Sequence, residues 1–134
     1  MRANRRVLFL ALGFSLFLAA APLLAHHSFM GEFDLTKVLT LKGTIVDVDW
    51  GNPHITFKID VKDEKGALTR WSLESASPGA LVRRGWSRDD LKFGELITVE
   101  CYAAKKGATV ATTKSVTFPN GRKLLAESDG VRPD

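Results

Sequence analysis

The chain has 134 residues, with 19 basic side chains, 15 acidic side chains and one cysteine. This length suits one domain and excludes two ordinary ones, and a lone cysteine excludes an internal disulfide framework. Three of the basic residues and none of the acidic ones lie within the first 25 positions, so the rest of the chain carries a net charge of about +1. No basic patch points to nucleic acid, and we expect no nucleic-acid partner.

The first 25 residues have the three-part pattern of a secretory signal peptide. Three arginines open the segment, residues 7–21 are almost entirely apolar, and Ala25 supplies a small residue at its end. The best cleavage point is after Ala25. Cleavage there predicts a periplasmic protein that begins at His26 and has no stable membrane span.

Three alternatives to this processing stay open. Cleavage after Ala21 satisfies the small-residue preference better, but it leaves Pro22 at the new terminus. Arg5 and Arg6 before an apolar run are similar to a twin-arginine export signal. Residues 7–25 are also nearly long enough for an uncleaved anchor, because a bilayer requires roughly 20 apolar residues.

The segment that follows residue 37 has the pattern of three β-strands. Residues 38–50 are rich in strand-forming residues, but their apolar positions change parity between Ile45 and Val46. This change predicts a bulge or bend within one long strand. Residues 54–61 alternate cleanly between apolar and polar, and residues 67–74 form a third strand after a hairpin connection.

The period then changes to that of a short helix. Ser77 is a good N-cap before Pro78, and Gly85 is a natural stop. Ser87 and Asp90 have the spacing of a capping box, which predicts one more short helical turn.

Two further strands complete the predicted domain. They are expected over residues 96–102 and 109–118, with a small terminal hairpin through Asn120 and Gly121. Three strands, a helix and two strands predict a mainly β fold: an OB-like five-stranded barrel with a short helix between strands 3 and 4. The alternative is a small β-sandwich.

These boundaries divide the chain into four parts. Residues 1–25 are the signal peptide, 26–37 an N-terminal arm, 38–126 the OB-like β domain and 127–134 a flexible tail. The tail is polar and contains glycine and proline, which is typical of a fraying terminus.

Several short phrases resemble a known protein family. They are HHSF at 26–29, LKGT at 41–44, NPH at 52–54, RRGW at 83–86 and PNGRKL at 119–124. Together they resemble a family of small exported bacterial proteins of unknown function. The resemblance covers essentially all of the chain after residue 25. It implies a periplasmic β-rich domain after a signal peptide, and it implies no particular activity.

The adjacent histidines His26 and His27 are the first candidate site. Cleavage after Ala25 would give His26 a free α-amine, which can chelate one metal ion together with its own imidazole. A second imidazole completes the three-nitrogen set called a histidine brace, and such ligation suits Cu(II). His54 is the candidate for that second imidazole, and His27 is an alternative ligand in a looser site. The competing interpretation is a mobile polar terminus.

The turn from Trp50 to His54 is the second candidate site. In an OB-like barrel this turn joins the first two strands, close to where such folds bind ligands. Trp50 and Asn52, together with Trp86, are therefore candidate ligand-binding residues. The structural alternative is that the Asn-Pro step fixes a turn, Trp50 fills the barrel end and His54 bonds to a backbone carbonyl.

Two other groups favour structural roles. Glu74, Arg83 and Arg84 are able to hold an anion or to pair with one another, and pairing is preferred because a helix C-terminus already favours arginine. Cys101 has apolar neighbours of its own parity and is expected to be a small buried side chain.

The sequence contains no nucleophile elbow, phosphate-binding glycine loop, HExxH or CxxC motif, so we do not expect an enzyme. The main hypothesis is a periplasmic binding module that takes Cu(II) at its mature N-terminus. The alternative is a metal-free envelope domain that binds a partner protein or small ligand at the 50–54 turn. A third hypothesis is an enzyme that uses the bound copper oxidatively.

Overall fold

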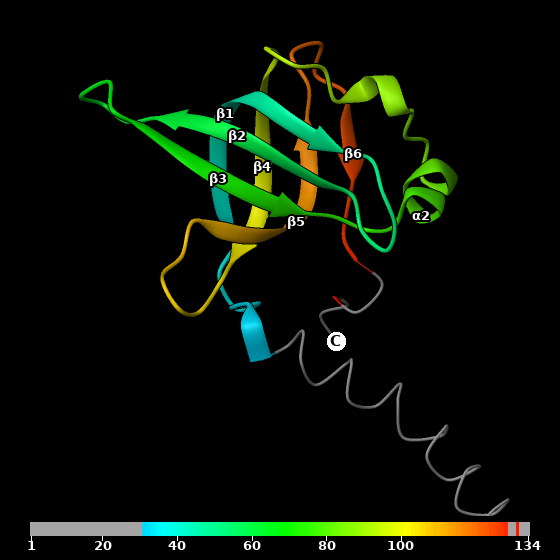
Figure 1. Ribbon diagram of the computed structural model, residues 1–134, viewed down its shortest axis with the longest axis horizontal. Helices are drawn as coiled ribbons and strands as arrows, with labels where there is room; N and C mark the ends of the chain where they lie inside the picture. The colour runs from blue at the N-terminus through cyan, green and yellow to red at the C-terminus, as the bar shows by residue number, and fades with distance from the viewer. Residues whose placement is uncertain (1–30, 129–130, 132–134) are drawn as a thin grey trace, which may run out of the picture.

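The computed structural model describes residues 31–128 and residue 131. Within these residues a single sheet curls into a barrel with a short helix beside it (Figure 1). The elements are β1 (Leu39–Asp49), β2 (Thr56–Lys62), β3 (Leu68–Glu74), the helix α2 (Pro78–Arg83), the 3-10 turn η1 (Arg88–Asp90), β4 (Leu96–Ala103), β5 (Val110–Thr117) and β6 (Lys123–Leu125).

The strand order identifies the architecture. The strands follow the order β3-β2-β1-β4-β5-β6, and β3 also pairs with β5. The β3–β5 pairing is parallel, whereas the other neighbours are antiparallel. The first five strands thus form a closed circuit, with β6 as an added edge. This closure confirms the predicted OB-like five-stranded barrel, because a sandwich would leave β3 and β5 in separate sheets.

The predicted irregularity in the first strand is present. The β1–β2 register passes from Ile45 opposite Ile59 to Asp47 opposite Lys58, which leaves Val46 without a partner. The strand bends at such a bulge. As a result β1 pairs with β4 over its first half and with β2 over its second half.

The interior of the barrel is apolar. Its most completely buried side chains, each at most 1% exposed, include Ile45, Ile55, Phe57, Ile59, Leu73, Leu81, Ile97, Val99, Cys101 and Val116. Cys101 therefore has the predicted structural role. Burial raises the pKa of its thiol to about 12, which keeps the sulfur in its unreactive protonated form.

Both predicted helix starts are capped as expected. The Ser77 hydroxyl accepts a hydrogen bond from the Ala80 N–H at 3.3 Å, and Pro78 occupies the first turn of α2. At η1, Ser87 and Asp90 form a capping box, each side chain bonding to the other end of the turn. The helix α2 has only six residues, and none of the helices within 31–128 has the length and apolar character needed to cross a bilayer.

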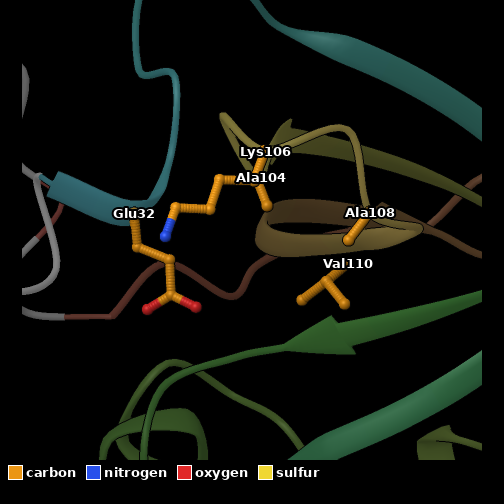
Figure 2. A pocket seen from close by; sticks show the side chains of 5 residues that line it. All are labelled: Glu32, Ala104, Lys106, Ala108 and Val110. Atoms are coloured by element: carbon orange, nitrogen blue, oxygen red, sulfur yellow. The ribbon is translucent and has the colours of Figure 1, made fainter.

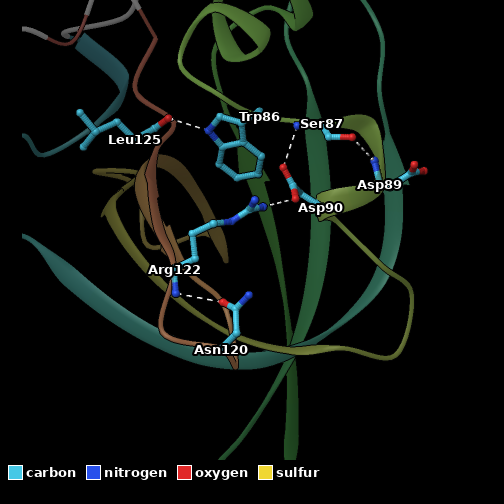
Figure 3. A network of polar contacts seen from close by, with 7 residues as sticks. All are labelled: Trp86, Ser87, Asp89, Asp90, Asn120, Arg122 and Leu125. Atoms are coloured by element: carbon cyan, nitrogen blue, oxygen red, sulfur yellow. Dashed lines mark hydrogen bonds and ion pairs between the residues drawn. The ribbon is translucent and has the colours of Figure 1, made fainter.

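Trp86 fastens the terminal hairpin to the barrel (Figure 3). Its indole N–H donates to the Leu125 carbonyl at 2.8 Å, and its ring meets Phe118 edge-on at 5.7 Å. On the same side Arg122 pairs with Asp90. Trp86 is only 4% exposed, so it is part of the core and not of an open surface.

The end of the chain differs from the flexible tail expected over 127–134, at the residues that the structure describes there. The Ser128 hydroxyl donates to the Ser75 carbonyl at 3.3 Å, and Val131 is 1% exposed. Val131 packs in a small cluster with Phe33, outside the main core. A single apolar residue in a polar stretch has no periodicity, which is why the sequence pattern missed it.

Gly43 gives a direct test of the β1–β2 register. A Cβ atom at this position would lie 2.8 Å from the Asp60 carbonyl oxygen, which belongs to the backbone of the neighbouring strand. We expect Gly43→Ala to destabilise the protein by about 2 kcal/mol in urea unfolding, because the two strands must separate to admit the methyl group.

Gly51→Ala is the matched control. There the closest atom to an added Cβ is the Asp49 side-chain oxygen at 2.9 Å, which can rotate away. Its effect should stay below about 0.5 kcal/mol. Equal effects of the two substitutions would contradict the register.

Candidate functional site

The described part of the N-terminal arm is held against the end of β4. Phe33 is 2% exposed and forms a bridge with Ala104, and the Asp34 N–H donates to the Ala103 carbonyl at 2.9 Å. His26 and His27 lie outside the described residues. The arm therefore has a fixed anchor at Phe33, seven residues after His26.

His54 lies two residues before the start of β2 and contacts the end of β3. Its Nδ1 atom is 2.6 Å from Glu74 Oε1, and the two side chains are 39% and 30% exposed. Their meeting follows from the register, since Thr56 pairs with Glu74 and His54 precedes Thr56 by two residues on the same face. The Nε2 atom of His54 makes no polar contact with any residue in the described ranges.

The barrel closure brings this pair near the anchor of the arm. Glu74 pairs with Thr112 on β5, and Thr112 pairs with Tyr102 on β4. Strands lie about 4.8 Å apart, so two steps separate the backbones of Glu74 and Tyr102 by about 10 Å. Tyr102 in turn packs in one cluster with Phe33. The end of β3 and the start of β5 meet in Figure 1.

Beyond His54, the outer face of β1, β2 and β3 carries cross-strand ion pairs. Lys58 Nζ lies 2.8 Å from Asp47 Oδ2, and Arg70 holds both oxygens of Asp60 at 2.8 and 2.9 Å. The hydrogen bond from Lys58 lowers the pKa of Asp47, and that from Arg70 lowers the pKa of Asp60. Most of the charge on the middle of this face is therefore neutralised within the face itself.

The structure places the other predicted site residues in two environments. Trp50 is half-buried and packs against the main core, whereas Asn52 is exposed in the turn. Trp86 is buried and bonded to Leu125, so it has no surface to offer a ligand. The predicted group of Trp50, Asn52 and Trp86 thus does not form one exposed surface.

A separate cavity lies beside the arm (Figure 2). It has a volume of about 400 Å³ and is lined by Glu32, Ala104, Lys106, Ala108 and Val110. The Lys106 side chain extends toward Glu32, and Ala104, Ala108 and Val110 supply the apolar part of the lining. The cavity is therefore mixed in character, with one charge of each sign.

Across residues 31–128 and 131, no group of three His, Cys, Asp or Glu side chains is arranged to hold a metal ion. His54 and Glu74 are two side chains, and their shortest contact is with each other. Any metal held at His54 would need ligands from elsewhere. The predicted brace assigns them to the N-terminal histidine.

Comparison with known proteins agrees with the sequence pattern. Residues 15–114 match a family of unknown function, DUF6152. The chain belongs to this family. None of the curated proteins matches it. Among solved structures, it is similar to the mitochondrial single-stranded DNA binding protein Rim1 from S. cerevisiae, at 14% identity and a TM-score of 0.46, over 68% of this chain and 95% of that one.

The DUF6152 match spans His26, His27, His54 and Glu74, and it ends within β5. The sequence pattern places Glu74 with the arginines Arg83 and Arg84, whereas in the structure Glu74 contacts His54. The contact between His54 and Glu74 depends on the register of the β2–β3 hairpin, which pairs Thr56 with Glu74. That register cannot be assigned from the sequence until the length of the turn is known. In the structure Arg84 donates to the Glu127 carbonyl.

Asp60 should contribute to the acid sensitivity of the fold. Its folded-state pKa lies below the ordinary value of 3.8, so the carboxylate stabilises the protein above that pH and the contribution is lost as pH falls through the folded-state pKa. In Asp60→Asn, unfolding measured by urea should depend less steeply on pH between about pH 4 and pH 2 than in the parent protein.

Asp89→Asn is the control for this comparison. Asp89 is exposed and makes no ion pair with the residues that the structure describes. Its replacement should leave the pH dependence of the parent protein in place. If the stability of Asp60→Asn fell with pH as steeply as that of the parent protein, the ion pair between Asp60 and Arg70 would contribute nothing to the acid sensitivity.

Proposed function

We propose that this protein is an exported, periplasmic binding module that holds Cu(II) between its mature N-terminus and His54. Cleavage after Ala25 would free the α-amine of His26, which binds with its own imidazole. His54 supplies the third nitrogen, and His27 is an alternative ligand. The described residues contribute His54 and its surroundings to this proposal.

The observation that carries the proposal is the contact between His54 Nδ1 and Glu74 Oε1, at 2.6 Å. Histidines that bind metals almost always present their second ring nitrogen to a carboxylate, a carbonyl or water, which fixes the tautomer and the ring orientation. With Nδ1 committed to Glu74, the exposed imidazole has Nε2 available as a ligand. Glu74 thus acts as a positioning residue for His54.

The length of the arm is compatible with this arrangement. Six residues lie between His26 and the anchor at Phe33, and the last two of them, Gly31 and Glu32, are helical. The five steps from His26 to Gly31 reach at most about 17 Å when the chain is fully extended. Phe33 packs with Tyr102, whose backbone lies about 10 Å from that of Glu74. The fully extended arm thus reaches further than this 10 Å spacing, so its length permits an approach to the Glu74 end of the barrel.

The chemistry of the proposed ligands favours copper. Two imidazoles and an amine form a nitrogen-rich set that suits Cu(II) better than the oxygen-preferring cations. The amine must lose its proton to bind, and its reference pKa is about 7.7–8.0. Binding should therefore strengthen as pH rises from about 6 to about 8.

One observation favours the metal-free alternative. Asn52 and Pro53 are exposed at the tip of the loop that joins β1 to β2. Such a tip is accessible to a partner protein or small ligand in the cell envelope. In that case His54 and Glu74 would be a surface ion pair that stabilises the loop.

The test begins with the protein exported through its own signal, with the mature N-terminus established by mass spectrometry. Cu(II) is then titrated in competition with a chelator. We expect His54→Ala and one extra residue before His26 each to weaken binding by at least a hundredfold. Glu74→Gln should weaken it by about 10- to 100-fold, because the imidazole loses its positioning group.

Asp47→Asn serves as the matched control, since Asp47 lies on the same face but pairs with Lys58 rather than with His54. It should bind Cu(II) as the parent does. The proposal fails if His54→Ala binds as tightly as Asp47→Asn, or if the mature chain begins anywhere other than His26.

A further inference from the structure

A second groove lies on the outer face of the barrel, at the other end of the β2–β3 hairpin from His54 and Glu74. Its volume is about 380 Å³, which is within the range of small-molecule sites. The residues that line it are Lys42, Gly43, Thr44, Val46, Asp60, Lys62, Leu68 and Leu96. They come from four adjacent strands, β1 to β4.

Two lysines occupy neighbouring backbone positions in this groove, and the end of the Lys62 side chain lies toward the β2–β3 turn, close to Gly66. Gly43 pairs with Val61, so Lys42 and Lys62 are the next residues on neighbouring strands. Both are exposed, and neither forms an ion pair with a residue that the structure describes. The one carboxylate of the groove, Asp60, is already held by Arg70 through two hydrogen bonds.

This arrangement favours an anion. Like charges opposite each other on adjacent strands destabilise a sheet. A negative group placed between Lys42 and Lys62 would remove that repulsion and gain two ion pairs. The ion pairs elsewhere on the face are complete, so the lysine pair is its uncompensated part.

Apolar side chains surround the same two lysines. Leu68 pairs with Lys62 in the strand register and is 65% exposed, and Leu96 pairs with Thr44 and is 48% exposed. The bulge adds Val46 to the groove. These exposed aliphatic groups would be shielded from water by a ligand with an alkyl chain.

We propose that the groove binds an amphiphilic anion with a single alkyl chain. The head group lies between Lys42 and Lys62, and the chain covers Leu68, Leu96 and Val46. A carboxylate on an acyl chain has this chemistry. The proposal is independent of copper, because no residue of the groove contacts His54 or Glu74.

The full mature protein is titrated with decanoate, octanoate, acetate and octyl glucoside, with binding followed by calorimetry and by the amide signals of Gly43 and Thr44. We expect decanoate to bind several-fold more tightly than octanoate, because each added methylene buries apolar surface. Acetate lacks the chain and octyl glucoside lacks the charge, so each should bind at least tenfold more weakly than decanoate.

The double variant Lys42→Gln, Lys62→Gln should bind decanoate at least tenfold more weakly, and Leu68→Ser at least threefold more weakly. The control is Lys65→Gln, Lys106→Gln, which removes the same charge from exposed positions outside the groove. Circular dichroism verifies that each variant is folded.

Three results would overturn the proposal. Binding of decanoate no tighter than that of acetate would remove the role of the alkyl chain. An equal loss of decanoate binding in the two double variants would reduce the effect to net charge. Loss of decanoate binding in the Lys65→Gln, Lys106→Gln control alone would place the binding site at the cavity that Lys106 lines, away from the groove.

Discussion

The parallel pairing of β3 with β5 is the interaction on which the remaining features depend. It joins Ser72 to Val110 and Glu74 to Thr112, and so turns an open sheet into a barrel. Without it the end of β3 would be an edge, and His54 would contact a carboxylate at the margin of an open sheet. With it, the His54–Glu74 pair lies two strands from the segment that anchors the N-terminal arm.

The outer face of β1, β2 and β3 is divided along its length by the same register. His54 and Glu74 lie at one end, and paired charges occupy the middle. At the other end lie Lys42 and Lys62, which form no ion pair with the part of the chain that the structure describes. Successive side chains of a strand point to opposite faces of the sheet. The even-numbered residues of β2 and β3 point outward, and the bulge in β1 brings Asp47 onto the same face as Lys42. One small barrel thereby presents two chemically distinct surfaces.

The sequence predicted the features that depend on local chemistry. The parity change at Ile45 predicted the bulge, Ser77 and Pro78 predicted the start of the helix, and the strand order predicted the barrel. The contact of His54 with Glu74 depends on the register between strands, and the burial of Val131 on a distant cluster. Neither feature produces a periodic pattern in the sequence, so both could be identified only from the structure.

The most direct test of a copper site shared between the N-terminus and the barrel is paramagnetic, because Cu(II) broadens the NMR signals of nearby nuclei. In the mature protein with one equivalent of Cu(II), we expect loss of the amide signals around His54 and Glu74. Signals of the β2–β3 turn at Gly66 should remain sharp. Broadening confined to the residues next to Phe33, with His54 and Glu74 unchanged, would contradict a site shared between the N-terminus and the barrel.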